Sequence, residues 1–166
     1  MTQSTRQPPV DHIARTQALY AGLGYPDYAW VREAQPPPIV RLRRPLRELT
    51  LGLVGSGGVY RHGQVAFHHA DDTSLRRVPV DTPGSALRAT HFAYDLSAAR
   101  RDSNVVLPLR GLRSLVSRGA IGRLAEDALT FMGGIYSARR VRERVAPAVL
   151  NELRRMEVDA ALLVPV

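Results

Sequence analysis

An apolar run that meets a cluster of glycines leaves few folds open to this chain. Glu48–Val54 is followed at once by Gly55-Ser56-Gly57-Gly58, and a second apolar run, Val158–Val166, closes the sequence. Short apolar runs bounded by turn residues are typical of buried strands, and helical spacing separates these two. The pattern predicts an α/β domain with three layers and a mostly parallel sheet, of Rossmann-like or flavodoxin-like type.

The elements between these two runs follow from apolar spacing and turn residues. Helices are expected over 10–21, 109–116 and 137–157, and strands over 75–80 and 104–109. In the last helix Ser137 is the expected N-cap. Pro147 predicts a kink there, or two helices that meet near Ala146.

The chain divides into an arm and a domain. Residues 1–47 are expected to form an N-terminal arm with a proline-rich linker at Gln35-Pro36-Pro37-Pro38, which favours extended backbone. Residues 48–166 are expected to form the α/β domain. A chain of 166 residues is long enough for one ordinary domain of this kind.

Composition excludes several kinds of chemistry. The chain has no cysteine, so it carries no disulfide, thiolate metal site or cysteine nucleophile of its own. All 23 basic residues are arginine, which excludes a Schiff-base or phosphate-loop lysine. The sequence also lacks a bilayer-length apolar stretch and a secretory signal, so we expect a cytoplasmic protein without a membrane partner.

The net charge of +8 invites a nucleic-acid hypothesis, which the motifs do not support. The arginines are scattered, with small clusters at 41–47 and 139–144. No helix-turn-helix, zinc-finger or aromatic-rich RNA motif accompanies them, so nucleic acid is not an expected partner.

The glycine turn Gly55–Gly58 is a candidate for ligand contact. A turn at the carboxyl end of a strand can direct several N–H groups at an anion, and Ser56 adds a hydroxyl group. The dinucleotide fingerprint fails because its third glycine is missing. A tight turn without ligand contact explains the glycines equally well.

The segment 60–101 holds four of the five histidines, namely His62, His68, His69 and His91. Together with nearby aspartates they could build a metal site, but their spacing matches no specific metal signature. We therefore expect no metal, and histidines that face solvent or form hydrogen bonds are the alternative interpretation.

Seven short blocks occur in one order along the chain. They are Leu53–Val59, Asp72–Pro79, Thr90–Asp95, Asp102–Leu109, Gly119–Gly122, Phe131–Ser137 and Val158–Val166. In this order they resemble the selenoprotein B family of the glycine/sarcosine/betaine reductases and D-proline reductase. The resemblance covers roughly Leu49 to the last residue.

The resemblance implies an activity and a missing group. Members of the family reductively cleave the C–N bond of an amino acid or its N-methylated relative, with a selenocysteine or cysteine shortly after the last strand. This sequence offers neither selenium nor sulfur after Val166. A UGA codon read as a stop, a remainder encoded as a separate chain, or a degenerate binding subunit would each explain this.

The resemblance therefore implies a component B-like subunit or fragment that lacks its own redox nucleophile. Its expected partners are other reductase subunits or a thiol or selenol protein, and its expected ligand is an amino-acid-like small molecule. The alternative is a non-catalytic interaction subunit whose arginine-rich surface binds an acidic protein.

Residue chemistry suggests roles at the expected site. Gly55, Ser56, Gly57 and Gly58 are candidate substrate-binding residues, and Arg76 or Arg77 can pair with a carboxylate through two hydrogen bonds. His91, Tyr94 and Asp95 are candidates to orient the substrate or move a proton. We expect the terminal strand to lie beside this glycine turn and beside a second one, Gly133-Gly134.

Overall fold

The computed structural model describes residues 10–26, 31–38 and 40–166. It divides the chain into two compact units, Met1–Pro38 and Ile39–Val166. The division falls before the boundary expected at residue 47. The first unit contains α1 (His12–Gly22), where Asp11 caps the helix by accepting a hydrogen bond of 3.0 Å from the N–H of Ala14. The helix expected over 10–21 is confirmed.

The second unit contains a mixed sheet in which most strands run parallel. Its strands are β3 (Arg76–Pro79), β6 (Asp127–Thr130), β1 (Thr50–Gly55), β5 (Arg123–Leu124) and β7 (Ala160–Val164). Strand β1 is buried along its whole length and runs parallel to β5, β6 and β7, whereas β3 runs antiparallel to β6. The α/β class and the mostly parallel sheet are therefore confirmed.

The register places β7 alone on one side of β1. Leu51 pairs with Leu124 of β5 and with Ala160 of β7, and Val54 pairs with Leu129 of β6 and again with β7. Since a strand has only two edges, β5 and β6 share one edge of β1 and β7 takes the other.

A second, two-stranded sheet lies beside the main one. It pairs β2 (Val59–Arg61) with β4 (Leu87–Ala89) in antiparallel orientation. Short helical segments connect the strands: η1 (Leu46–Glu48), η2 (Gly84–Ala86), α2 (Ser97–Arg101) and η3 (Ser103–Val105).

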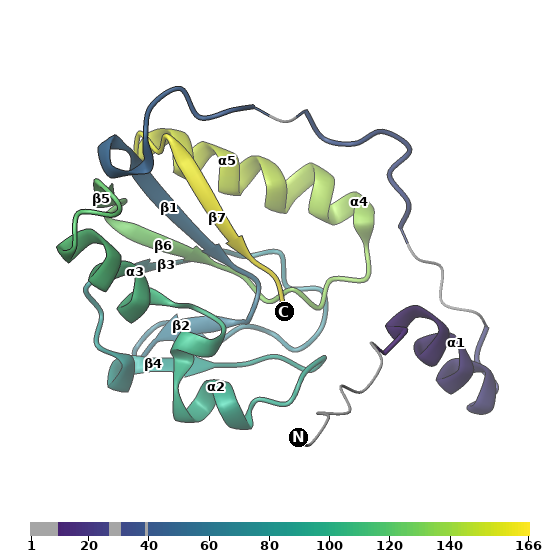
Figure 1. Ribbon diagram of the computed structural model, residues 1–166. Helices are drawn as coiled ribbons and strands as arrows, with labels where there is room; N and C mark the ends of the chain where they lie inside the picture. The colour runs from purple at the N-terminus through teal and green to yellow at the C-terminus, as the bar shows by residue number, and fades with distance from the viewer. Residues whose placement is uncertain (1–9, 27–30, 39) are drawn as a thin grey trace, which may run out of the picture. The chain divides into compact units, whose positions relative to one another are not determined.

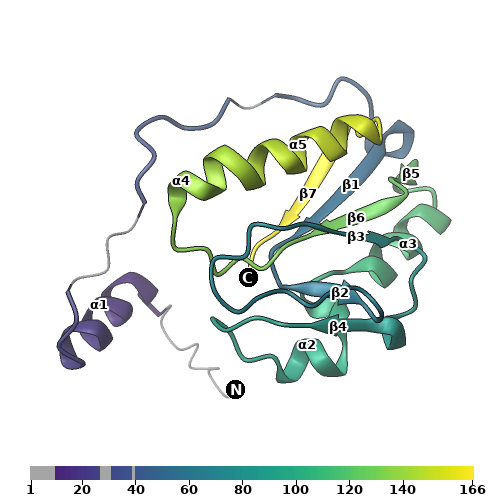
Figure 2. The ribbon, with the colours of Figure 1, turned by 180° about the vertical axis from the view of Figure 1, so that it is seen from behind.

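Helices cover both faces of the main sheet, as Figures 1 and 2 show. On one face, α3 (Leu109–Ser117) buries Leu109 and Leu112 in a cluster with Leu51 and Leu53 of β1. On the opposite face, α5 (Ala146–Arg155) contributes to a separate cluster around Val54 of β1. Two clusters on two faces make three layers.

The run of helix before β7 changes its hydrogen bonding where the sequence predicts a kink. It begins as α4 (Ala138–Arg140) with Ser137 as N-cap, continues as a π-helical turn, Val141–Val145, and becomes α5 with Pro147 in its first turn. Proline has no N–H to donate, so the preceding turn widens and an α-helix restarts at Ala146.

Two expectations are wrong. Residues 104–109 form no strand, because side chains bond the local backbone instead: Asp102 accepts from the N–H of Asn104 at 3.0 Å, and the side chain of Asn104 accepts from the N–H of Arg110 at 2.8 Å. The terminal strand is also not buried. Leu163 is 65% exposed, because β7 has β1 on one side and lies at the edge of the sheet.

No helix in the described ranges is both long and apolar enough to cross a membrane.

Candidate functional site

Three segments meet at the carboxyl end of β1. The N–H of Ser56 donates to the carbonyl of Val164 at 3.1 Å, and the hydroxyl of Ser56 accepts from the N–H of Val166 at 2.9 Å. The carbonyl of Ser56 accepts from the N–H of Gly133 at 2.8 Å. The terminal strand thus lies beside the first glycine turn, as expected from the sequence, whereas the second glycine turn contacts the first one through Ser56.

Close packing explains the glycines at this junction. A Cβ atom on Gly133 would lie 2.9 Å from the Cβ of Ser56, and one on Gly57 would lie 2.9 Å from the Cβ of Val106. Gly57 forms an isolated bridge with Met132, and the N–H of Gly58 donates to a carbonyl at 2.9 Å. Backbone partners therefore occupy the N–H groups of Ser56 and Gly58, and the hydroxyl group is the polar side-chain group that the turn presents.

Gly58 joins the turn to the segment that carries the candidate acid–base residues. Its φ of +65° is one that side chains disfavour, and a Cβ there would lie 1.9 Å from the carbonyl oxygen of Thr90. The N–H of Thr90 donates to the carbonyl of Gly58 at 3.0 Å. The position of His91, the next residue, depends on this close approach.

His91 is buried, with 7% of its surface exposed. Its Nδ1 accepts a hydrogen bond of 3.0 Å from the N–H of Ala93. Burial lowers the pKa of the imidazole from its usual 6.5. In the neutral ring an accepting Nδ1 places the proton on Nε2, and Nε2 is buried without a hydrogen-bond partner among the described residues. His91 therefore holds an unused donor.

Tyr94 ties the same segment to the glycine turn. Its hydroxyl donates to the carbonyl of Gly57 at 2.8 Å, and its ring centroid lies 4.8 Å from that of His91. Burial raises the pKa of Tyr94, while the positive charge of Arg100 acts in the opposite direction. The phenol is therefore neutral and donates its proton to the turn.

An aromatic stack continues outward from His91. The ring of Phe92 lies 5.9 Å from that of His91 and 5.8 Å from that of Tyr136, with interplanar angles of 19° and 28°. Gly134 admits Phe92, since a Cβ there would lie 2.1 Å from the ring. The sequence did not single out Phe92 and Tyr136 as site residues, although they lie in the blocks Thr90–Asp95 and Phe131–Ser137. Only the fold brings the two rings together.

Asp95 lies on the surface and serves the local backbone. Its carboxylate accepts from the N–H of Ser97 at 2.8 Å, at the start of α2. Hydrogen bonds from Ser97 hold the pKa of Asp95 below its usual value, and Arg101 and Arg100 act in the same direction. Of the three candidate acid–base residues, the structure thus brings His91 and Tyr94 together at the turn.

Arg76 is engaged in holding a loop. Its guanidinium group donates to the carbonyl of Val65 at 2.8 Å and to the hydroxyl of Ser74 at 2.8 Å. The same group lies 4.4 Å from the ring centroid of Phe67, at cation–π distance. These hydrogen bonds occupy N–H groups of Arg76 that a substrate carboxylate would use.

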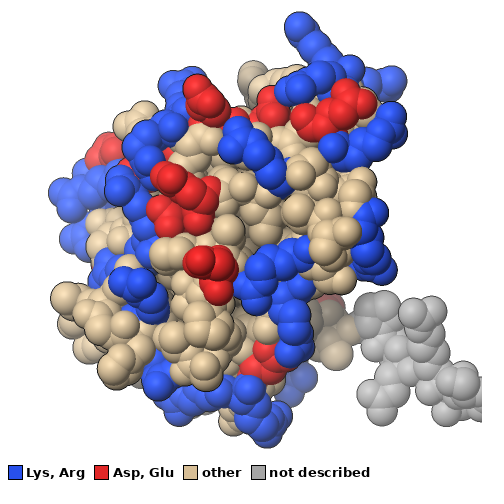
Figure 3. Space-filling model, turned by 90° about the vertical axis from the view of Figure 1, so that its left-hand side faces the viewer, with Lys and Arg blue, Asp and Glu red and all other residues tan. Residues whose placement is uncertain are grey.

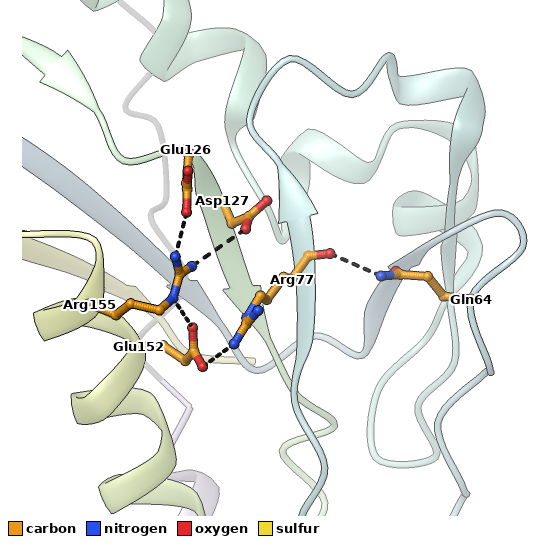
Figure 4. Close-up of polar contacts among 6 residues, drawn as sticks. All are labelled: Gln64, Arg77, Glu126, Asp127, Glu152 and Arg155. Atoms are coloured by element: carbon orange, nitrogen blue, oxygen red, sulfur yellow. Dashed lines mark hydrogen bonds and ion pairs between the residues drawn. The ribbon is translucent and has the colours of Figure 1, made fainter.

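Arg77 belongs to an ion-pair network that joins strands β3 and β6 to helix α5 (Figure 4). Its guanidinium group donates to Glu152, which also accepts from Arg155 at 3.0 Å. Arg155 in turn pairs with Glu126 at 2.7 Å and Asp127 at 4.0 Å. Hydrogen bonds from Arg77 and then Arg155 lower the pKa of Glu152. Arg77 thus holds α5 on the sheet.

The surface shows no single charged field on the face seen in Figure 3, where basic side chains form separate groups with acidic side chains between them. Within the described ranges, no group of three or more histidine and carboxylate side chains is arranged to hold a metal ion.

The cavity that reaches the junction is apolar. It has a volume of about 540 Å³ and lies between the helical run 141–153 and strand β7. Ser56 lines it together with apolar side chains such as Val54, Phe131, Leu150 and Leu163. This cavity is suited to apolar side chains rather than to a zwitterion, and of the polar candidate residues Ser56 alone is among its lining residues.

Comparison with known proteins places the chain in a family. Residues 40–166 match the family model described as glycine/sarcosine/betaine reductase selenoprotein B. No solved structure matches the chain.

Three curated relatives are similar over most of the chain. The D-proline reductase subunit gamma of Acetoanaerobium sticklandii is 31% identical over 129 residues, which are 77% of this chain and 53% of the relative. The glycine reductase complex component B subunit gamma of Symbiobacterium thermophilum is 27% identical over 84% of this chain and 32% of its own. The betaine reductase complex component B subunit beta of Peptoclostridium acidaminophilum is 26% identical, over 75% and 30% respectively.

The chain thus spans about half of the first relative and about a third of the other two. The family match includes every residue of the junction at the end of β1. The chain belongs to the glycine/sarcosine/betaine reductase selenoprotein B family.

Proposed function

We propose that this chain is a component B-like subunit or fragment of a reductase that cleaves the C–N bond of glycine, sarcosine, betaine or D-proline, and that it binds the amino-acid-like substrate. The observation that carries the proposal is the buried, unpartnered Nε2 of His91 beside the junction of the glycine turn and the terminal strand. A buried donor without a partner is costly unless a ligand completes it.

The tautomer of His91 defines its role in the proposal. Because Nδ1 accepts from a backbone N–H, the neutral ring can only donate, through Nε2. A fixed neutral donor orients a carboxylate and does not accept a proton from substrate. We therefore assign His91 to binding of the substrate carboxylate, with the hydroxyl of Ser56 as a second polar contact.

The proposal places the ligand at the carboxyl ends of the parallel strands, as in Rossmann-like and flavodoxin-like folds. Tyr94 supports the site indirectly, since its hydroxyl bonds the carbonyl of Gly57 and holds the turn against the His91 segment. Asp95, Arg76 and Arg77 enter the proposal only as supports, because each is engaged by nearby groups.

The redox nucleophile is proposed to come from outside these 166 residues, because the chain has no cysteine. A selenol or thiol of low pKa would attack the carbon and displace the amine, which leaves a selenoether or thioether. A dithiol of a partner protein would then attack the selenium or sulfur, so that the carbon leaves with a proton and the nucleophile is regenerated as the dithiol becomes a disulfide. The partner is proposed to be another reductase subunit or a thiol or selenol protein in the cytoplasm.

Isothermal titration calorimetry tests the substrate part. We expect wild-type protein to bind at least one of glycine, sarcosine, betaine and D-proline, and His91→Ala to bind it about tenfold or more weakly, as expected for loss of a buried hydrogen bond to a charged group. His62→Ala is the matched control, because His62 is an exposed histidine in the turn after β2. Equal affinity of wild type and His91→Ala, or no binding of any of the four, would refute the assignment.

A second function, a non-catalytic interaction subunit, is favoured by the net charge of +8 and the apolar cavity beside β7. Co-purification from the source cells separates the two. A stable complex with a thiol- or selenol-bearing subunit supports the reductase component, and a complex with a partner that lacks redox chemistry supports the alternative.

A further inference from the structure

Strand β7 has one unused edge. Among the described residues β7 pairs with β1 and with no other strand. The carbonyl of Val164 faces β1, because it accepts from the N–H of Ser56. Since successive residues of a strand direct their backbone groups to opposite edges, the N–H and C=O of Leu163 and Ala161 face outward. We call this outward side of Ala160–Val164 the β7 edge.

The β7 edge lacks the usual protection against pairing. Natural edge strands carry charges, inward-pointing lysines or bulges, whereas all five residues of β7 are apolar. Leu163 is 65% exposed and Leu162 is 38% exposed, and as neighbours in a strand they lie on opposite faces of the sheet. An added strand would cover apolar surface on both faces at once.

The face toward α5 already provides room for side chains. The apolar cavity of about 540 Å³ is lined by Leu163 of β7, by Leu150 of α5 and by Val141 of the π-helical turn. Leu150 is 45% exposed. Side chains of a strand beside β7 would enter this cavity from its open side, as alternate residues do on one face of a sheet.

Charge at the start of β7 selects the kind of occupant. Arg41, Arg43 and Arg44 line a hollow of about 380 Å³ together with Asp159, the residue before β7. Arg44 pairs with Asp159 at 2.8 Å, whereas the exposed Arg41 and Arg43 form no ion pair within the described ranges. Two unpaired arginines next to an open edge favour an acidic partner.

The same charges disfavour a second copy of this chain as the occupant. Two copies that paired through the β7 edge would bring two chains of net charge +8 together. The aligned region makes up 30% to 53% of the curated relatives' own length, so each of them has further polypeptide outside it.

We propose that an extended segment of a partner protein, apolar at alternate positions and flanked by acidic residues, adds to the β7 edge as a further strand. Backbone hydrogen bonds to Ala161 and Leu163 supply affinity, Leu163 and the cavity select apolar side chains, and Arg41 and Arg43 select the acidic flank. This docking surface does not depend on the substrate proposed above.

A synthetic peptide tests the proposal, with three valines alternating with threonines between pairs of glutamates, measured by fluorescence anisotropy against the full chain. We expect saturable binding and slower hydrogen exchange at the amides of Ala161 and Leu163. Leu163→Glu should weaken binding about tenfold or more, because it places a charge where apolar contact is needed. Val65→Glu is the control, because the side chain of Val65 is 80% exposed and lies in the loop between β2 and β3.

Charge and backbone controls make the test specific. Replacing the glutamates of the peptide by lysines, or introducing Arg41→Glu with Arg43→Glu, should weaken binding. The difference in affinity from the original peptide and protein should become smaller as the salt concentration rises. N-methylation of one alternate set of peptide amides should abolish binding while methylation of the other set leaves it intact. Equal loss or equal tolerance of both sets would overturn strand addition.

Two further outcomes would overturn the proposal. One is binding of the acidic peptide that Leu163→Glu leaves unchanged. The other is a dimer in sedimentation velocity that Leu163→Glu dissociates, because a second copy would then cover the β7 edge.

Discussion

Replacing Gly58 by alanine should destabilise the domain far more than the same change at another glycine of similar conformation. Gly58 has a φ of +65°, and a Cβ atom there would lie 1.9 Å from the carbonyl oxygen and 2.9 Å from the carbonyl carbon of Thr90. Backbone atoms cannot rotate away as a flexible side chain can. The second sheet or the turn would therefore have to shift by more than 1 Å to reach ordinary contact, roughly the distance by which these atoms overlap.

Gly119 supplies the matched control. Its φ is +71°, and a Cβ there would meet no atom within 4 Å. Left-handed backbone costs a non-glycine residue about 1–2 kcal/mol, and this strain applies to both variants. Forced overpacking adds about 1–3 kcal/mol at Gly58 alone. Both variants also gain about 0.4–1 kcal/mol from the stiffer unfolded chain, so their difference isolates the contact with Thr90.

Urea unfolding followed by circular dichroism measures this difference. We expect Gly58→Ala to lose about 1–3 kcal/mol more unfolding free energy than Gly119→Ala, at an unchanged urea slope. Because Thr90 precedes His91, Gly58→Ala should also alter the NMR signals of the His91 ring, and Gly119→Ala should not. Losses equal to within about 0.5 kcal/mol would refute the close approach of Gly58 and Thr90.

Three further predictions concern single side chains. Thr130→Val should lower the free energy of unfolding in urea by about 1–2 kcal/mol, because the buried hydroxyl donates to the carbonyl of Val59 at 2.5 Å. An unchanged free energy of unfolding would contradict a stabilising role of this hydrogen bond. His91 should titrate by NMR below pH 6.5, because burial lowers the pKa of its ring. As pH falls below 6.5, the unfolded state takes up a proton that the folded state does not, so the wild type should lose stability relative to His91→Gln. A measured pKa at or above 6.5 would show that the ring is not desolvated. Asp159 accepts a hydrogen bond of 2.9 Å from the N–H of Thr50, which lowers the pKa of its carboxyl group below 3.8. The wild type should therefore have a higher free energy of unfolding than Asp159→Asn above about pH 5, and this difference should disappear as pH falls through the folded pKa. A difference that persists at about pH 2 would argue against an ionised Asp159.

Local sequence signals were sufficient for the longer elements. The apolar run before Gly55 predicts β1, helical spacing predicts α3, and Pro147 predicts the restart of the helix at Ala146. These signals depend on residues close together in the sequence, so the elements can be predicted without knowledge of the tertiary contacts. The α/β class and the position of the terminal strand beside the first glycine turn followed from them.

Elements that depend on distant partners were missed or mistaken. Strands β2, β4 and β5 have two or three residues each, too few for a periodic pattern. The exposure of β7 could not be predicted, because an apolar run reads the same whether or not a neighbour covers it. The strand predicted at 104–109 does not form, because the side chain of Asn104 bonds the backbone N–H of Arg110 instead.

The candidate site shows the same division. The turn around Ser56 was found from its glycines and its place after a strand. The engagement of Arg77 by Glu152 was not, because 75 positions separate the two residues and no local pattern links them. The stack of Phe92 and Tyr136 likewise depends on the fold.

Ser56, Gly57 and Gly58 are the only residues between β1 of the main sheet and β2 of the two-stranded sheet. Ser56 follows β1, and His91 follows β4 of the two-stranded sheet. A molecule that binds both side chains would therefore link the two sheets and restrict their relative motion. Its binding would slow hydrogen exchange in β2 and β4 as well as at the site itself, which makes the rigidity of the small sheet a reporter of ligand occupancy.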